Sequence, residues 1–481
     1  MKSAHFILAA LALVGACKKH DNTNPYDSNV KPYFKDIIIQ EKLLNGNLVS
    51  WQHALGYFPS KDDPNTQIMV ASLGVEELND ARGFRIASIN KTTGKTNWVK
   101  SYDLDDQYLI QIATCATMDN DGFVWVGGHS FVGTQSARLF LLKMDGSGNI
   151  VWSNSFSNYS RWRAYSLTTL RNGDLAFLTK GPGGLMVHRI TANGLPVWST
   201  IVGYTNTYID DDYYTTPPNV NSPENHALVE TADGSIYFAT SSNSSGNGVG
   251  GSDRLYRLDA NGKLQFAQIY TLDGNSAPVR PVQLINAGND RLLMADQVFR
   301  NITGPSPYFV MLSLNGDVRL SRGRPANGDG FWGSCLNEIN WYQDNLYFST
   351  NGNREFDTYV IDNNLQLKSA VKTAAAQDIG TDRGGISLFD AADRALYYVL
   401  NFGGNWQESN GFEVTRNDAT GKPCINTYVN PPSSLQLQDL HVTVVADKVD
   451  TTGYGPAPTF TPLTWRPNPV AVIATENVCG Q

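Results

Sequence analysis

Short runs of alternating apolar and polar residues, separated by polar turns, recur along most of the chain. Within residues 164–202 four runs follow one another, over 164–170, 174–180, 185–190 and 196–202. The turn Asn172-Gly173 separates the first two runs and Asn193-Gly194 the last two. Asn-Gly between alternating runs indicates a hairpin, because both central residues of the turn need positive φ. The pattern predicts four antiparallel strands joined as a meander.

This unit repeats, and its marker is a turn glycine, once an asparagine, followed four residues later by a large apolar residue. The instances are Gly94/Trp98, Gly148/Trp152, Gly194/Trp198, Gly262/Phe266, Gly316/Leu320, Asn363/Leu367 and Gly421/Ile425, spaced by about 54 residues. Such a period with four short strands per unit is typical of propeller blades. We expect an all-β propeller of four-stranded antiparallel blades, with seven blades favoured and six or eight left open.

The rhythm fades towards both ends of the chain. An open ring of sheets would leave strand edges exposed, so we expect strands from both chain ends to close it. Residues 440–445 resemble a first strand for the blade that contains residues 68–74, and residues 48–54 are the rival candidate. The propeller is therefore predicted over 47–449, with a C-terminal tail over 450–481 packed on it.

Three tryptophans share the position four residues after a turn glycine: Trp98, Trp152 and Trp198. We expect them to lie in outer strands and to pack between neighbouring blades, because a large flat side chain fills the wedge between diverging sheets.

Two stretches resemble the repeats of known propellers. Residues 87–98, ASINKTTGKTNW, resemble the repeat of PQQ-like (quinoprotein-type) propellers. Residues 142–153, LKMDGSGNIVWS, resemble the repeat of propellers common in secreted and surface proteins of Bacteroidetes. The resemblance covers residues 65–445 as a blade pattern and implies a fold rather than a substrate. Quinoprotein dehydrogenases often carry adjacent cysteines at the cofactor; this chain has no such pair, and we expect no cofactor.

The first residues read as a targeting segment. Lys2 precedes an apolar stretch, residues 4–16, that is too short to span a bilayer comfortably. Its end, Val14-Gly15-Ala16-Cys17, resembles the bacterial lipoprotein signal, in which the cysteine is acylated, for example with palmitate. The alternative is an ordinary secretory signal with an incidental cysteine.

We therefore expect a lipoprotein signal peptide over 1–16, lipidation of Cys17 and a flexible tether over 17–46. Lys18 instead of aspartate after the lipidated residue is compatible with anchoring at the outer membrane of a bacterial cell envelope. The leaflet side, periplasmic or surface, is left open.

Charge and cysteine content narrow the possible partners. The net charge is −8, which argues against a nucleic-acid partner because such proteins carry a basic stripe. Export permits disulfides, and Cys424 with Cys479 is the candidate pair, stapling the tail onto the last blade. Cys115 and Cys335 lie in apolar runs and are expected to be buried thiols. We expect a monomer.

Candidate ligand-binding residues lie in the long connections between blades and between second and third strands. In a meander these connections open on one face, and irregular loops on a rigid scaffold usually carry function. The candidates are Trp162, Arg163, Tyr213, Arg280, Trp332, Arg383 and Trp406. Trp162, Trp332 and Trp406 lack the outer-strand spacing, so they either cap the core or form a binding platform.

Aromatic rings beside carboxylates and guanidinium groups suit a glycan, because rings stack on its C–H face while polar groups bond its hydroxyls. The same mixture suits a partner protein. Asp210, Asp211 and Asp212 are weak candidates for Ca²⁺ binding, and a solvated acidic loop is the favoured interpretation. No metal site is therefore predicted.

Catalytic motifs are scarce. The chain has no Gly-x-Ser-x-Gly, no His-Glu-x-x-His and no phosphate-binding glycine loop, and its seven histidines are scattered. The favoured function is a non-catalytic, membrane-anchored binding or scaffold lipoprotein. The alternatives are a polysaccharide hydrolase or lyase that uses paired carboxylates, and a purely structural part of an envelope assembly.

Overall fold

The computed structural model describes most of the chain after residue 32. The described ranges are 33–39, 51–74, 82–104, 110–132, 136–157, 162–181, 184–204, 227–242, 252–272, 277–278, 283–299, 305–323, 335–336, 338–352, 355–374, 386–390, 392–402, 410–418, 437–447, 449–450, 459–469 and 472–479. All elements of these ranges are β-strands, β1–β36. The expectation of an all-β fold is confirmed.

The strands form groups in chain order, and each strand within a group pairs antiparallel with its neighbour. The first three groups are β2 (Trp51–Pro59), β3 (Thr66–Gly74), β4 (Arg82–Asn90) and β5 (Thr96–Leu104); β6 (Ile110–Met118), β7 (Val124–Val132), β8 (Ser136–Met144) and β9 (Ile150–Ser157); β10 (Arg163–Thr169), β11 (Leu175–Gly181), β12 (Gly184–Ile190) and β13 (Pro196–Tyr204). These match the meander read from residues 164–202.

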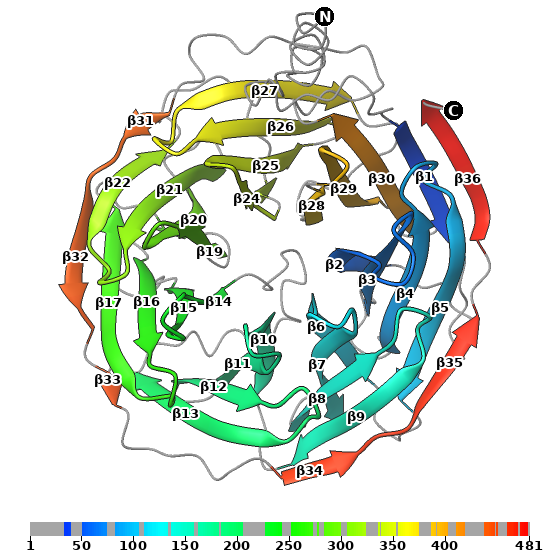
Figure 1. Cartoon of the computed structure of the whole chain (residues 1–481), viewed down its shortest axis with the longest axis horizontal. Coiled ribbons are helices and arrows are strands. Elements are labelled where there is room, and N and C mark those ends of the chain that lie inside the picture. Colours follow the sequence, from blue (N-terminus) through cyan, green and yellow to red (C-terminus); the bar gives the residue numbers. More distant parts are fainter. Residues whose placement is uncertain are drawn as a thin grey trace, which may run out of the picture.

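Four further groups follow. The fourth is β14 (Leu228–Glu230), β15 (Ile236–Ser242), β16 (Ser252–Leu258) and β17 (Leu264–Leu272), and the fifth is β19 (Gln283–Gly288), β20 (Arg291–Phe299), β21 (Pro305–Ser313) and β22 (Val318–Gly323), with β18 (Ala277–Pro278) paired to β20. The sixth is β24 (Asn340–Tyr342), β25 (Asn345–Gly352), β26 (Glu355–Asp362) and β27 (Leu367–Ala374), with β23 (Cys335–Leu336) paired to β25. The seventh is β28 (Ile386–Asp390), β29 (Ala395–Phe402) and β30 (Asn410–Asp418). Figure 1 shows the groups arranged about a common centre, with the first strand of each group innermost.

Hydrogen bonds join the described strands into six sheets, one fewer than the seven groups. One is a ten-stranded sheet, in which the first two groups are joined by a short parallel contact between β4 and β6. That contact pairs Arg82 with Gln111 and Gly83 with Ile112.

Both chain ends meet in one sheet. The N-terminal strand β1 (Tyr33–Ile39) pairs antiparallel with β30, from Tyr33↔Arg416 to Ile39↔Asn410. Residues 33–39 lie within the segment interpreted as a tether, so this part of it is a strand. The run Ile37-Ile38-Ile39 favours this strand, because β-branched residues suit a pleated surface.

The C-terminal residues 437–479 form what we call the C-terminal belt. Its strands pair antiparallel with the outermost strand of six groups: β31 (Gln438–Asp439) with β22, β32 (Val442–Ala446) with β17, β33 (Val449–Asp450) with β13, β34 (Thr459–Pro462) with β9, β35 (Trp465–Pro469) with β5 and β36 (Val472–Cys479) with β1. The belt visits the groups in reverse chain order, as its orange and red strands show at the periphery (Figure 1).

The belt corrects one expectation. Residues 440–445 do not supply the innermost strand beside residues 68–74; they lie at the outer edge of β17, and β2 is the innermost strand, close to the rival prediction of 48–54. The physical reason is one-sided burial. Val442 and Val444 pack against a buried cluster, whereas Val445 is 50% exposed, as an outer edge strand allows.

Neighbouring groups are held together by the tryptophans and turn glycines of the sequence rhythm. Each tryptophan lies against the turn glycine of the following group: Trp98 against Gly148, Trp152 against Gly194 and Trp198 against Gly262. The three tryptophans are half-buried and pack against the apolar clusters between groups. The expectation that they pack between neighbouring units is confirmed.

The turn glycines have two reasons to lack a side chain. Gly148, Gly194 and Gly262 have φ of 78°, 80° and 81°, a left-handed conformation that costs other residues energy. A Cβ added at Gly194 would come within 2.2 Å of the Trp152 ring. In the sixth instance the left-handed residue is Leu365, at φ 55°, and not Asn363, so that pair was assigned two residues too early. Gly421 lies outside the described residues.

Gly194→Ala tests the tryptophan contact. We expect it to cost about 1 kcal/mol for the left-handed backbone and about 1–3 kcal/mol more for displacing Trp152, measured by urea unfolding. The matched control is Gly173→Ala, because Gly173 has φ of 86° and nothing within 4 Å of an added Cβ. Equal losses in the two variants would contradict the role of the ring.

Trp465→Ala tests the belt. Trp465 is 7% exposed, lies edge-on against Phe84 and Phe140, and donates a hydrogen bond from Nε1 to Ser153 Oγ at 2.7 Å. We expect a loss of about 3–5 kcal/mol of unfolding free energy. Val445→Ala, also in the belt, is the control and should stay within about 0.5 kcal/mol. A similarly small effect of Trp465→Ala would show that the belt does not stabilise the sheets.

Candidate functional site

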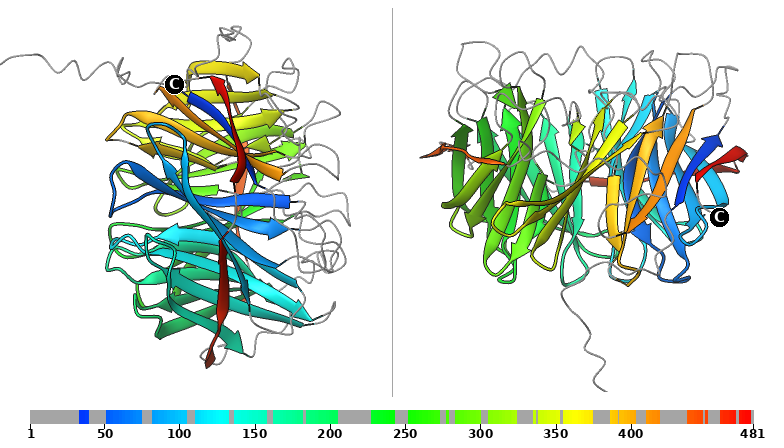
Figure 2. Two further views of the ribbon diagram at one scale, coloured as in Figure 1. Left: turned by 90° about the vertical axis from the view of Figure 1, so that its right-hand side faces the viewer. Right: turned by 90° about the horizontal axis from the view of Figure 1, so that it is seen from above.

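The two ends of the strands define two faces. We call turn face the side that carries the short turns between first and second and between third and fourth strands, such as 119–123 and 145–149. We call the opposite side the connection face. Strands end or begin there where the chain passes from one group to the next and where it passes from a second strand to a third. The turns lie together on one side of the molecule (Figure 2).

Two of the predicted ligand-binding residues are described. Trp162 is half-buried and packs against an apolar cluster that contains Trp125 and Phe156, as the core-capping interpretation expects. Arg163 is the first residue of β10 and pairs with Lys180. The remaining candidates lie outside the described residues: Tyr213, Arg280, Trp332, Arg383, Trp406, the weak metal candidates Asp210, Asp211 and Asp212, and the lipidation candidate Cys17.

The cysteines divide in the same way. Cys115 is fully buried, as expected. Cys335 lies in β23 and Cys479 in β36, where it pairs with Phe34. Cys424 lies outside the described residues, so the disulfide stays a prediction.

Metal-ligand clusters and membrane-spanning helices are both absent from the described ranges. Within those ranges, no group of three His, Cys, Asp or Glu residues is placed to hold a metal ion. In the same part of the chain, no helix is long and apolar enough to cross a membrane.

On the connection face, polar contacts link the innermost strands of three neighbouring groups. The amide of Ile339 donates to Gln283 Oε1 at 3.0 Å. The amide of Ser387 donates to Glu338 Oε2 at 3.3 Å, and Ser387 Oγ donates to the Glu338 carbonyl at 2.6 Å. Gln283 begins β19, Glu338 precedes β24 and Ser387 lies at the start of β28, so the three residues follow the inner rim of this face.

Glu338 is electrostatically unusual. The residue is partly buried, and desolvation of its carboxyl raises the pKa to about 8, although the Ser387 amide bond acts in the opposite direction. The carboxyl therefore keeps its proton at neutral pH. A neutral carboxyl can act as a general acid, the role in which enzymes use such groups.

The turn face is occupied by a recurring ion pair that we did not predict. A basic residue of the third strand reaches an aspartate in or beside the turn between the first and second strands of its own group. The pairs are Lys143–Asp119 at 3.0 Å, Arg189–Asp174 at 2.8 Å, Arg257–Asp233 at 2.8 Å and Arg416–Asp393 at 3.5 Å.

Aromatic residues accompany these pairs. Lys143, Arg257 and Arg416 lie 5.0, 5.5 and 5.8 Å from the ring centroids of second-strand aromatic residues, namely Trp125, Tyr237 and Tyr397. The four basic residues also stand opposite Trp152, Trp198, Phe266 and Tyr33 in the register. A basic residue nine residues before the large aromatic was the sequence signal, present in three of the four pairs.

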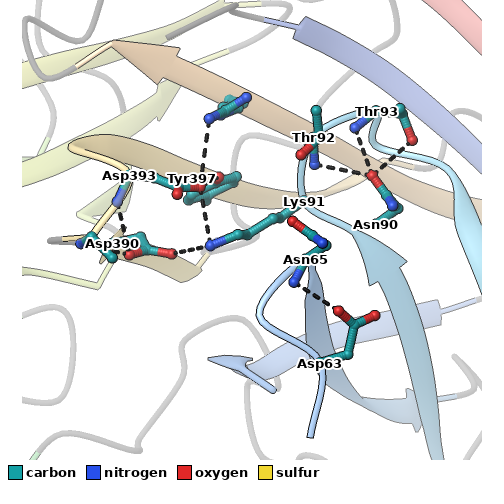
Figure 3. Close-up of polar contacts among 11 residues, drawn as sticks. Asp63, Asn65, Asn90, Lys91, Thr92, Thr93, Asp390, Asp393 and Tyr397 are labelled. Atoms are coloured by element: carbon teal, nitrogen blue, oxygen red, sulfur yellow. Dashed lines mark hydrogen bonds and ion pairs between the residues drawn. The ribbon is translucent and has the colours of Figure 1, made fainter. Parts of the chain in front are cut away.

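The densest polar cluster on the turn face joins the first and last groups. Lys91 Nζ lies 3.2 Å from both Asp390 Oδ2 and Asp393 Oδ2, and Tyr397 donates its hydroxyl to Asp393 Oδ2 at 2.9 Å (Figure 3). Lys91 is 8% exposed. Its backbone amide donates to the carbonyl of Asn65 at 2.8 Å, which fixes the turn that carries it. We call Lys91, Asp390, Asp393 and Tyr397 the Lys91 cluster. Together with Arg416, which pairs with Asp393, it sets two cations against two carboxylates, so its contacts tie the first group to the last.

Comparison with known proteins assigns no family. No family model and no curated protein matches the chain. Similar solved structures are the polysaccharide lyase Uly1 (10% identity, TM-score 0.46, 82% of this chain and 98% of that chain), a protein of unknown function from Dyadobacter fermentans DSM 18053 (9%, 0.41, 82% and 100%) and a subtype N10 neuraminidase-like protein of A/little yellow-shouldered bat/Guatemala/060/2010 (11%, 0.38, 66% and 100%). At these identities the likenesses assign no activity, and the PQQ-like repeat stays a prediction.

Lys91→Ala tests the Lys91 cluster. Removing the ammonium leaves Asp390 buried without its cation, and we expect the unfolding free energy to fall by about 3 kcal/mol at pH 7. The control is Lys368→Ala: Lys368 is exposed, bonds Asn345 Oδ1 at 2.9 Å, and should contribute less than about 0.5 kcal/mol. An effect of Lys91→Ala no larger than that of the control would contradict a clamp between first and last groups.

Proposed function

We propose that this protein is a seven-bladed propeller, lipid-anchored at Cys17, that acts as a binding protein and engages a glycan with its connection face. The seven groups correspond to the seven blades. The ten-stranded sheet then counts as two blades, because only the pairs Arg82↔Gln111 and Gly83↔Ile112 join its halves.

The observation that supports this placement is the internal use of the turn face. Basic residues of the third strands pair with turn aspartates, as in Lys143–Asp119. Tryptophans cover turn glycines, as Trp152 does at Gly194. Backbone carbonyls of the turns accept further bonds from neighbouring groups, for example Ala260 from Trp198 Nε1 at 3.2 Å. A surface whose polar groups satisfy one another offers few of them to a ligand.

The connection face differs because the strands on either side of the predicted binding residues end or begin there. Tyr213, Trp332 and Trp406 fall between described strands that end there: β13 and β14, β22 and β23, and β29 and β30. Aromatic rings with nearby carboxylate and guanidinium groups suit stacking on sugars and bonding of hydroxyls. A glycan is thus the ligand class to test first, and a partner protein is the alternative outcome.

A glycan array probed with the soluble chain, residues 25–481, tests the proposal. We expect selective binding, and a loss of at least about tenfold in affinity for Trp332→Ala and Trp406→Ala, as for aromatic residues at the centre of an interface. The matched control is Leu195→Ala on the turn face, which should bind like the unchanged protein. Folded protein that binds no glycan would contradict the glycan, and equal binding by all variants would contradict the face.

A second candidate function, a polysaccharide hydrolase or lyase, is favoured by Glu338. Its raised pKa suits a proton donor, and its position before β24, at the inner rim of the connection face, supports such a role towards a ligand bound there. Glu338→Gln should then lower turnover at least about 100-fold, and the activity of the unchanged protein should fall as pH rises above about 8. Turnover that survives this substitution would remove Glu338 as the acid.

The same shift predicts a pH dependence of stability that needs no substrate. The pKa of the Glu338 carboxyl is about 8 in the folded state against 4.5 for the unperturbed group, so the folded state binds more protons between these values. Its contribution to the unfolding free energy therefore decreases as pH rises from about 4.5 to 8. Glu338→Gln should flatten this part of the stability profile, measured by thermal unfolding at several pH values. An unchanged profile would contradict the shift.

A further inference from the structure

We propose that the turn face is the membrane-facing surface of the anchored protein, so that the connection face points away from the bilayer. This inference rests on the proposed anchoring at Cys17. The partner of the turn face is a zwitterionic lipid surface, and the supporting observations are the direction of β1 and three exposed apolar side chains.

The chain enters its first described strand at the turn face. β1 runs antiparallel to β30, with Tyr33 opposite Arg416 and Ile39 opposite Asn410. Arg416 is the turn-face end of β30, because its guanidinium reaches Asp393 in the turn after β28. Tyr33 therefore begins at the turn face, and the segment that leads back to Cys17 starts from this side.

The length of that segment limits how far the protein can stand from its anchor. Residues 18–32 are fifteen residues and can reach at most about 50 Å when fully extended. A flexible chain of this length has a root-mean-square span of about 20 Å. The strands are up to nine residues long, about 30 Å, so the connection face begins a further strand length away from the attachment point. The short tether favours the turn face as the side next to the lipid.

Three of the four large apolar side chains that are exposed among the described residues lie on the same face, and the fourth, Val445, lies in the belt. Among the described residues, Val151 is 58% exposed, Leu195 63% and Val197 47%. Val151 is the second residue of β9, Leu195 closes the turn before β13, and Val197 is the second residue of β13. Burying such side chains at a lipid interface is favourable, as for interfacial anchors.

The two features together define a plane. The tether enters at the group of β28–β30 and β1, whereas the apolar residues lie on the groups of β6–β9 and β10–β13, which are not adjacent to it. Contacts at three separated places, the tether entry and these two groups, hold a face, and not a single point, against a bilayer. The turns carry exposed carboxylates such as Asp121 together with exposed cations such as Lys263, so the face has charges of both signs and the proposed contact is apolar.

The test places a fluorescent amino acid in the full-length, lipidated protein, bound to phosphatidylcholine vesicles that contain a nitroxide-labelled quencher lipid. One probe replaces Asn193, exposed in a turn-face turn; the matched probe replaces Gln438, exposed in β31, where it pairs with Gly323 near the connection face. We expect quenching at 193 to exceed quenching at 438 at least threefold. Equal quenching, or stronger quenching at 438, overturns the orientation.

A second variant keeps the result interpretable. Replacing Val151, Leu195 and Val197 together by serine should leave the fold and vesicle flotation unchanged, because the side chains are exposed, and should reduce quenching at 193 at least twofold. Unchanged quenching overturns the apolar contact.

Flotation separates this proposal from the anchoring on which it rests. The unchanged protein should float with vesicles and Cys17→Ser should not. If neither floats, the anchor fails and the orientation with it. If the unchanged protein floats with the opposite quenching pattern, only the orientation is wrong.

Discussion

The contact between an aromatic ring and the turn glycine of the next group is the interaction on which the arrangement depends. It couples packing to backbone hydrogen bonding, because the same turns also accept bonds from outer strands. Tyr270 and Thr200 donate their hydroxyls to the carbonyls of Gly316 and Gly262, both at 2.6 Å. Because glycine has no Cβ, a ring can lie against the turn, as Trp198 does at Gly262, while the glycine carbonyl accepts a hydrogen bond. The first four groups are thereby held against one another through Trp98, Trp152 and Trp198, and this sets the relative position of their strand ends.

Much of this could be predicted from the sequence because the signals are local. Asn172-Gly173 predicts a hairpin by itself. The spacing of Trp152 from Gly148 predicts that this tryptophan packs between neighbouring groups. Other features depend on partners distant in the chain. Residues 440–445 have the alternation of any half-buried strand, and only the free edge of β17 decides where they pair. Lys91 and Asp390 are 299 residues apart, and nothing near either one indicates the other. The raised pKa of Glu338 likewise comes from desolvation, which no short stretch of sequence encodes.

The two faces differ in how their polar groups are used. On the turn face, hydrogen bonds from Thr231 and Ser235 and the charge of Arg257 overcome desolvation and lower the pKa of Asp233 to about 2, so its charge is committed to the fold. On the connection face, desolvation dominates at Glu338 and keeps a carboxyl neutral. A carboxyl thus stays charged on one side of the molecule and neutral on the other, according to its surroundings. The charged aspartate and the neutral glutamate lie at opposite ends of the strands, one on each face.

The reverse course of the C-terminal belt has a consequence for biogenesis. The ribosome makes β31–β36 last, yet these strands cover the outer edges of sheets whose other strands were made long before. Each of six outer edges stays unpaired until its own belt strand, from β31 to β36, has emerged, and an unpaired edge can recruit other chains. β1 has the complementary problem, since it is made first and must wait for β30. The outer edges of the sheets can therefore be completed only when the whole polypeptide is present.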